Sequence, residues 1–235
     1  MKNLFLLLIS IIPSLIILKI VYKKDSQKEP MSLLIALFGV GILSVFVVFF
    51  LSMISSVIFP RITSGNIETL SIFEIGIYSF IFVALFEEGV KWTFVYSIIF
   101  NHKEFDQIYD SIVYSVFLSL GFATFENVLY VFQNGYSVGV FRAITAVPSH
   151  AFFAIAMGYY IGFSKLSYIN KNYKLEKKYR IYSLIIPVLL HGMYDFCLLS
   201  QNLLLIIVFA AFVIYLYVSS IRKVKQFERV KNNLY

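Results

Sequence analysis

The sequence predicts an all-α, polytopic membrane protein with about seven transmembrane helices, built as a single domain over residues 1–235. Hydrophobic residues make up 60% of the 235 residues and charged residues only 14%. A soluble domain of this size has too little interior to bury so much apolar surface. The apolar residues also fall into runs of about 20 or more, the length that crosses a bilayer. Basic residues gather between alternate runs, as in multi-pass membrane proteins.

The predicted spans are seven apolar runs. They occupy residues 3–21, 33–58, 73–100, 110–133, 140–163, 181–200 and 202–220. The first run resembles a signal peptide, but no small-residue cleavage site follows it, so we expect an uncleaved span. Only Gln201 and Asn202 separate the last two runs, which predicts a tight helical hairpin.

Lysine and arginine predict the orientation. Fifteen lysine and arginine residues lie on one predicted side, in the loops and in the basic tail 221–235. Three lie on the other side: Lys2, Arg61 and Arg142. This asymmetry predicts the N-terminus outside and the C-terminus in the cytoplasm of a multi-pass cell-membrane protein. The net charge of +7 is spread over loop segments. That pattern favours contact with the anionic lipid bilayer and no nucleic-acid partner.

The third run contains three charged residues, Glu87, Glu88 and Lys91. A charge at mid-membrane costs at least about 2.5–3.5 kcal/mol, so it needs a partner or a function. Lys91 follows Glu87 by four residues and Glu88 by three, so either can pair with it on one helix face. Such a pair can be structural and only orient helices. Two adjacent buried carboxylates can also exchange a proton, as general acid–base catalysis requires.

Other polar residues interrupt the later runs at similar depth: Glu126 and Asn127, then His150, then His191 and Asp195. At helical rise, both histidines lie about 13 Å below the outer ends of their spans, and Glu126 about 10 Å below. His191 and Asp195 are four residues apart and therefore share a helix face. One cavity that opens outward is the economical explanation for four helices carrying such groups.

These intramembrane polar residues have more than one possible role. A lone histidine or asparagine in a membrane is often only an interhelical hydrogen bond. Two histidines with carboxylates at one depth favour a metal site or a proton-transfer network. Pro148 and Pro187 each precede a histidine and are expected to loosen the turn before it. The HExxH motif is missing, so zinc ligands would come from different helices. The lone Cys197 excludes an intrachain disulfide and reads as a small buried hydrophobe.

Four motifs then make a specific resemblance, within a predicted core at about residues 72–200. They are Glu87–Lys91, Gly121–Asn127 after Asp110, His150–Ala154 and His191–Asp195. In order and spacing the chain resembles the PrsW family of membrane-embedded proteases. More distantly, it is similar to CAAX prenyl endopeptidases and bacteriocin-immunity-type membrane proteases. The resemblance implies a metalloprotease that makes the first, site-1 cut in a single-pass anti-sigma factor near the extracytoplasmic face.

The chain departs from the distant relatives in two places. Glu126-Asn127 stands where they carry a histidine motif, and Lys91 replaces a slightly later arginine. A glutamate in those relatives can activate water without a stable metal. The resemblance therefore leaves two expectations open, a bound Zn²⁺ and a metal-free site.

The residues expected to act fall into two groups. The predicted catalytic residues are Glu87, Glu88, Lys91, Glu126 and Asn127. Among them, Glu87 is expected to act as general base and Asn127 to donate a hydrogen bond to the developing oxyanion. The predicted metal ligands, or alternatively groups that polarise the scissile carbonyl, are His150, His191, Asp195 and Glu126.

Two rival functions use the same residues. An ion-coupled transporter can use buried carboxylates and histidines as a proton relay, although we detect no inverted repeat of the kind many carriers show. A structural membrane scaffold would use them only to hold helices together.

Overall fold

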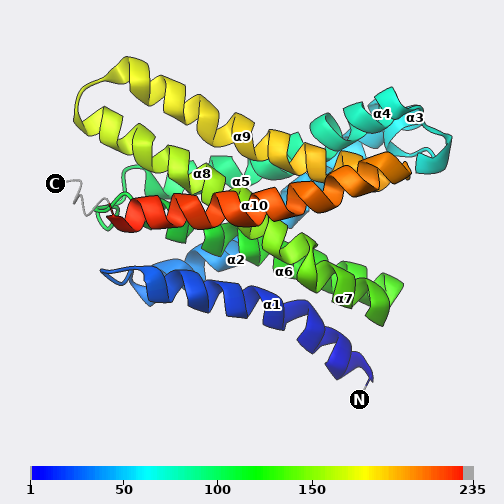
Figure 1. The fold of residues 1–235 in the computed structure, drawn as a ribbon, viewed down its shortest axis with the longest axis horizontal. Coiled ribbons are helices and arrows are strands. Elements are labelled where there is room, and N and C mark those ends of the chain that lie inside the picture. The colour runs from blue at the N-terminus through cyan, green and yellow to red at the C-terminus, as the bar shows by residue number, and fades with distance from the viewer. Residues whose placement is uncertain (1, 230–235) are drawn as a thin grey trace.

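The structure is a computed structural model that describes residues 2–229, and this part of the chain is helical with no strand (Figure 1). Its elements, in chain order, are α1 (Lys2–Lys24), α2 (Met31–Ile58), α3 (Pro60–Thr63), the 3-10 turn η1 (Ile67–Thr69), α4 (Ile72–Ile77), the π-helical stretch η2 (Tyr78–Leu85), α5 (Phe86–Ile99), α6 (Asp110–Asn134), α7 (Tyr136–Ile144), α8 (Ala146–Ile169), α9 (Tyr173–Leu199) and α10 (Leu203–Arg229).

Six helices in residues 2–229 are long and apolar enough to cross a membrane. The all-helical membrane class predicted from the sequence is thus confirmed, whereas the predicted count of seven is not. The difference lies in the third apolar run, where α4, η2 and α5 divide the segment Ile72–Ile99 into three short elements. Residues 136–169 count as one span although Thr145 separates α7 from α8.

The predicted hairpin between the last two spans is confirmed. Helix α9 ends at Leu199 and α10 begins at Leu203. Gln201 takes a positive φ of 51°, which reverses the chain within the short connection. The Oδ1 of Asn202 accepts a hydrogen bond of 2.9 Å from the backbone N–H of Leu204 and so caps the start of α10.

Helix α6 forms the centre of the bundle. In the most apolar stretch of α6, 78% of the residues are buried, whereas in that of α10, at the periphery, 17% are buried. Close packing on α6 depends on glycine, because a Cβ at Gly41 of α2 would collide with the backbone of Leu118, and one at Gly121 with the backbone of Phe38. This reciprocal contact lets α2 and α6 approach closely, as small residues do in membrane bundles. Gly121, the first residue of the Gly121–Asn127 motif, thus admits a neighbouring helix.

At one end of α6, the loops around residues 25–30 and 101–109 meet over buried carboxyl groups. The hydroxyl of Tyr114 donates a hydrogen bond to Glu29, and the Oδ2 of Asp110 accepts one of 2.6 Å from the backbone N–H of Gln107. Burial raises the pKa of Glu29 to about 7. These contacts tie both loops to the start of α6 and fix the helix that carries Glu126 at its other end.

Candidate active site

Four helices bring the acids and imidazoles of the predicted site together. On α5, the Nζ of Lys91 lies 2.8 Å from the Oε1 of Glu88 and 3.2 Å from the Oε2 of Glu87. From α9, the Nδ1 of His191 lies 2.9 Å from the same Oε1 of Glu88. Glu88 and Lys91 are fully buried, and Glu87 is 7% exposed. The pairing of both glutamates with Lys91 is the arrangement that their spacing predicted.

His150 of α8 closes the second half of the cluster. Its Nδ1 lies 3.4 Å from the Nζ of Lys91, and its Nε2 lies 3.0 Å from the Oε2 of Glu126 on α6. The two imidazole rings stand nearly perpendicular, with centroids 5.3 Å apart. His191 uses its Nε2 to contact the Oδ2 of Asp195 at 3.3 Å. Each imidazole thus directs Nδ1 toward the Glu87–Glu88–Lys91 group and Nε2 toward its own carboxylate.

The local backbone explains why these side chains can meet. The π-helical stretch η2 ends at Leu85, two residues before Glu87. π-Helical turns are rare and recur at functional sites, because they shift the register of the residues that follow. Against η2, Gly192 leaves room for the ring of Phe80, which a Cβ at this position would strike. Helix α9 therefore approaches η2 closely just where it carries His191.

The two prolines act differently from one another. Pro187 lies inside α9, one turn before His191, so it removes a helical hydrogen bond as expected. Pro148 instead lies in the first turn of α8, which begins at Ala146. Backbone N–H groups in a first turn have no helical acceptor, so a proline there costs no bond. The backbone is nevertheless interrupted at Thr145, in the turn before Pro148, where α7 ends and α8 begins.

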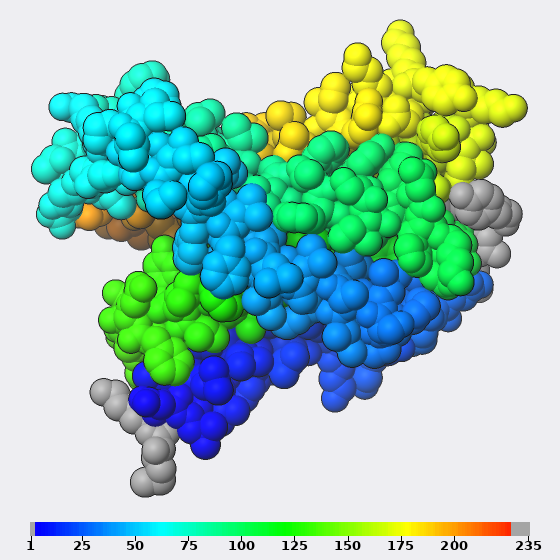
Figure 2. Space-filling model, turned by 180° about the vertical axis from the view of Figure 1, so that it is seen from behind, coloured from blue at the N-terminus to red at the C-terminus, as the bar shows by residue number. Residues whose placement is uncertain are grey.

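A cleft reaches the cluster from the surface. A cavity of about 340 Å³ between α2, η2 and α6 is lined by Ser52, Glu87 and Glu126, and a smaller one of about 150 Å³ joins Glu87 and Glu126 to His150. Figure 2 shows the molecule hollowed on this side, between the segment around residues 59–75 and the α6–α7 region. Glu87 and Glu126 line both cavities and Asp195 lines the smaller one, so water can reach these three carboxylates, whereas Glu88 lines neither cavity.

Asn127 points elsewhere. Its Nδ2 donates a hydrogen bond of 3.1 Å to the backbone oxygen of Ser10 on α1, and its Oδ1 accepts one of 3.0 Å from the Nε of Arg142. Both polar atoms are thus engaged outside the group formed by the glutamates and Lys91. This is the interhelical role that a lone intramembrane asparagine commonly has.

Arg142 is the site residue that sequence reasoning missed. Its place in the sequence indicates only a charge on the outer side, yet its side chain is 14% exposed and its Nη2 lies 3.0 Å from the Oε2 of Glu126. The guanidinium also stacks over Tyr130 at 4.0 Å and lines the smaller cavity. The available signal was a lone arginine early in an apolar run, where a buried carboxylate partner is expected.

The residues suit a metal ion in type and in spacing. Glu87, Glu88, His150 and His191 each offer one ligand atom, and these atoms lie within 4.8 Å of one another. Two imidazoles with carboxylates form a common catalytic zinc set. The predicted set contained Glu126 and Asp195 in place of the two glutamates. In the structure, Glu126 and Asp195 each contact a histidine Nε2, as carboxylates that orient metal-binding histidines do.

Buried carboxylates and imidazoles around a cleft, in a bundle of bilayer-length apolar helices, are the features expected of an intramembrane hydrolase. The family model described as PrsW family intramembrane metalloprotease matches residues 29–220. The chain belongs to the PrsW family of intramembrane proteases, and it is therefore a peptidase of the cell membrane. This family membership favours the peptidase interpretation over the transporter and the scaffold.

Several relatives named Protease PrsW match most of the chain, and three of them illustrate the similarity. The protein of Geobacillus kaustophilus is 36% identical over 215 residues, or 91% of this chain and 88% of the relative. That of Clostridioides difficile is 37% identical over 94% of this chain and 91% of its own length. That of Bacillus subtilis is 33% identical over 82% of each. No solved structure shows a significant match to the chain.

Proposed function

We propose that the chain hydrolyses a peptide bond of a single-pass membrane protein, an anti-sigma factor, with Glu87 as general base. The observation that carries this assignment is the difference between two adjacent carboxylates. Glu87 lines both cavities of the cleft, whereas Glu88 is fully buried against Lys91 and His191. Only Glu87 of the pair is placed to hold a water molecule beside a substrate carbonyl.

The reaction follows from this placement. Glu87 takes a proton from water as the water oxygen bonds to the scissile carbonyl carbon, and the C–N bond then breaks as the proton passes to the leaving amine. Lys91, the cationic group nearest Glu87, offsets the negative charge that develops on the carbonyl oxygen. Glu88 holds Lys91 and His191 in place, and Glu126 does the same for His150.

A zinc ion would be held by His150 and His191 together with Glu87 or Glu88, and it would supply Lewis-acid polarisation of water or of the carbonyl. Lys91 competes with such an ion, because its ammonium group already lies 2.8–3.4 Å from Glu88, Glu87 and His150. Removal of metal by a chelator, followed by elemental analysis and an assay, tests the requirement directly.

We further propose that Ile72–Ile99 forms a seventh span, with the N-terminus outside and the C-terminus in the cytoplasm. The segment is helical throughout and packs between α2 and α9. Thr63, from the connection after α2, lines the cleft, so the cleft opens toward the predicted outer side. That placement supports a cut near the extracytoplasmic face. The orientation is tested by introducing one cysteine, at Ser64 or at Lys103, into a Cys197→Ser background and labelling intact cells with a membrane-impermeant thiol reagent. The proposed orientation requires that only Ser64→Cys reacts.

Glu87→Gln tests the assignment of the base. We expect the rate of cleavage of a labelled anti-sigma-factor peptide by purified protein to fall about 10²–10⁴-fold, the usual contribution of general base catalysis. Glu74→Gln is the matched control, because Glu74 pairs with the exposed Arg61 outside the site. It should keep full activity. An active Glu87→Gln protein would remove the assignment.

A further inference from the structure

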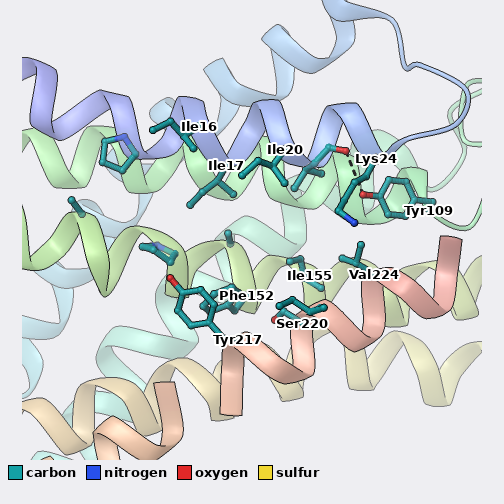
Figure 3. A pocket seen from close by; sticks show the side chains of 16 residues that line it. Ile16, Ile17, Ile20, Lys24, Tyr109, Phe152, Ile155, Tyr217, Ser220 and Val224 are labelled. Atoms are coloured by element: carbon teal, nitrogen blue, oxygen red, sulfur yellow. Dashed lines mark hydrogen bonds between the residues drawn. The ribbon is translucent and has the colours of Figure 1, made fainter. Parts of the chain in front are cut away.

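A second cavity lies apart from the cleft. It measures about 660 Å³ and is bounded by α1, α8 and α10. Its walls are almost wholly apolar, with Ile17 and Ile20 on α1, Phe152 and Ile155 on α8, and Tyr217 on α10 (Figure 3). We call this cavity the α1–α8–α10 groove. Ile20 is 51% exposed and Tyr217 40%, so the groove is open along its rim.

We propose that the α1–α8–α10 groove binds one anionic phospholipid, with its acyl chains between the helices and its headgroup at Lys24. In a bilayer, an apolar groove of this kind is filled either by lipid or by another protein. Three features of the groove, its length, its volume and its charge, favour the lipid.

The length of the groove matches one leaflet. Its wall on α1 extends from Pro13 to Lys24, which is about 16 Å at helical rise. One leaflet of the hydrocarbon core is about 15 Å deep, half of about 30 Å. The groove therefore reaches from the headgroup level to the bilayer midplane, whereas a spanning helix would need a groove about twice as long.

The volume leads to the same conclusion. A helix about 10 Å across and about 30 Å long occupies more than about 2,000 Å³, over three times the volume of the groove. An extended hydrocarbon chain is about half as wide, so two chains of one leaflet need roughly 600 Å³. The groove thus fits the two chains of a single phospholipid.

Charge marks one end of the groove. Lys24 lies there beside Tyr109 and Val224 (Figure 3). Lys23 on α1, and Arg222 and Lys225 on α10, flank the same end and are exposed. Clustered cations at the headgroup level attract anionic lipid. The opposite end, at Pro13 and Ile16, is apolar, as the midplane of the bilayer requires.

The test is lipid retention measured by native mass spectrometry. The full chain is reconstituted in vesicles of equal parts phosphatidylglycerol and phosphatidylcholine, extracted in mild detergent and weighed with its bound lipid. We expect one retained phospholipid, enriched in phosphatidylglycerol. Lys24→Gln should lower that enrichment about fivefold, the effect of one basic residue near an anionic surface. Lys24 is exposed, so this variant is expected to fold.

Two variants of α10 separate the groove from the rest of the lipid-facing surface. Ser220 lines the groove and is 5% exposed, so Ser220→Phe should fill it and lower retention about tenfold. Val218, two residues away and 42% exposed, does not line the groove. Val218→Phe is the matched control and should retain lipid as the unmodified chain does.

Three outcomes would overturn the proposal. Equal retention of phosphatidylglycerol and phosphatidylcholine would remove the charged headgroup site. If Ser220→Phe left lipid retention unchanged but abolished self-association, as measured by light scattering, the groove would be assigned to a second copy of the chain. Unchanged lipid together with weaker binding of a peptide substrate would assign it to the substrate helix.

Discussion

Helix α8 separates two regions of opposite character. On one face, His150 belongs to a cluster of charged and polar groups that contact one another within and between helices. On the other, Pro148, Ala151 and Phe152 line an apolar groove. The polar region is held by pairings within the chain, because unpaired charges in a membrane are costly. The apolar region has no such requirement, and it leaves room for the surrounding lipid.

The strongest way to break the polar region is Lys91→Met. The change leaves Glu87 and Glu88 buried without their shared cation. Loss of one partner of a buried ion pair costs about 3–5 kcal/mol, so we expect a lower thermal midpoint together with loss of cleavage. Lys165→Met is the control, since Lys165 is also a buried lysine but contacts the backbone oxygen of Phe100 far from the site. If Lys91→Met retained activity, Lys91 would have no part in the site.

Arg142→Gln should have an intermediate effect on the polar region. Arg142 holds Glu126, which in turn contacts His150, so it is a positioning residue. Loss of such support typically costs about 10–100-fold in activity. We expect the loss in kcat rather than in KM, with partial rescue by Arg142→Lys, which keeps the charge but not the fork of donors. Arg61→Gln, at an exposed pair, should have no effect. An unchanged kcat in Arg142→Gln would contradict this role.

Glu29→Gln should give the smallest effect, because Glu29 lies in a loop at the end of the bundle away from the polar region. Burial raises its pKa from 4.5 to about 7, so the folded state favours the neutral carboxyl. The contribution of the neutral Glu29 carboxyl to the free energy of unfolding is fully present below about pH 4.5 and is lost as the pH rises through about 7. We expect the thermal midpoint to fall by a few degrees over that range, and Glu29→Gln to remove the decline. Identical melting profiles for both proteins would contradict this.

The polar region was largely predictable from the sequence, because a charge buried in a bilayer has a high free-energy cost. Glu87, Glu88, His150 and His191 stand out inside apolar runs because bilayer-buried charge demands a partner. Depth follows from residue count at fixed helical rise, so a shared level for these groups could be predicted. Their convergence on a single cluster is what the structure shows.

Rotation about the helix axes was not predictable. Residue counting does not reveal which side of each imidazole faces which carboxylate. In the structure, Glu126 and Asp195 contact the Nε2 atoms of the histidines, whereas Glu87 and Glu88 lie on the Nδ1 side. The π-helical stretch Tyr78–Leu85 shifts that rotation further, and no pattern in an apolar run marks it. The α1–α8–α10 groove was equally hidden, because it depends on how three helices diverge.

The central claim is that imidazoles from α8 and α9 act in one site, and a double-mutant cycle on His150 and His191 tests it most directly. Groups that act as a unit give strongly non-additive losses. We predict that His150→Ala and His191→Ala each abolish most of kcat, and that the double variant is scarcely worse than either alone. Losses that multiply, with each single variant keeping substantial activity, would show two independent contributions and contradict the account.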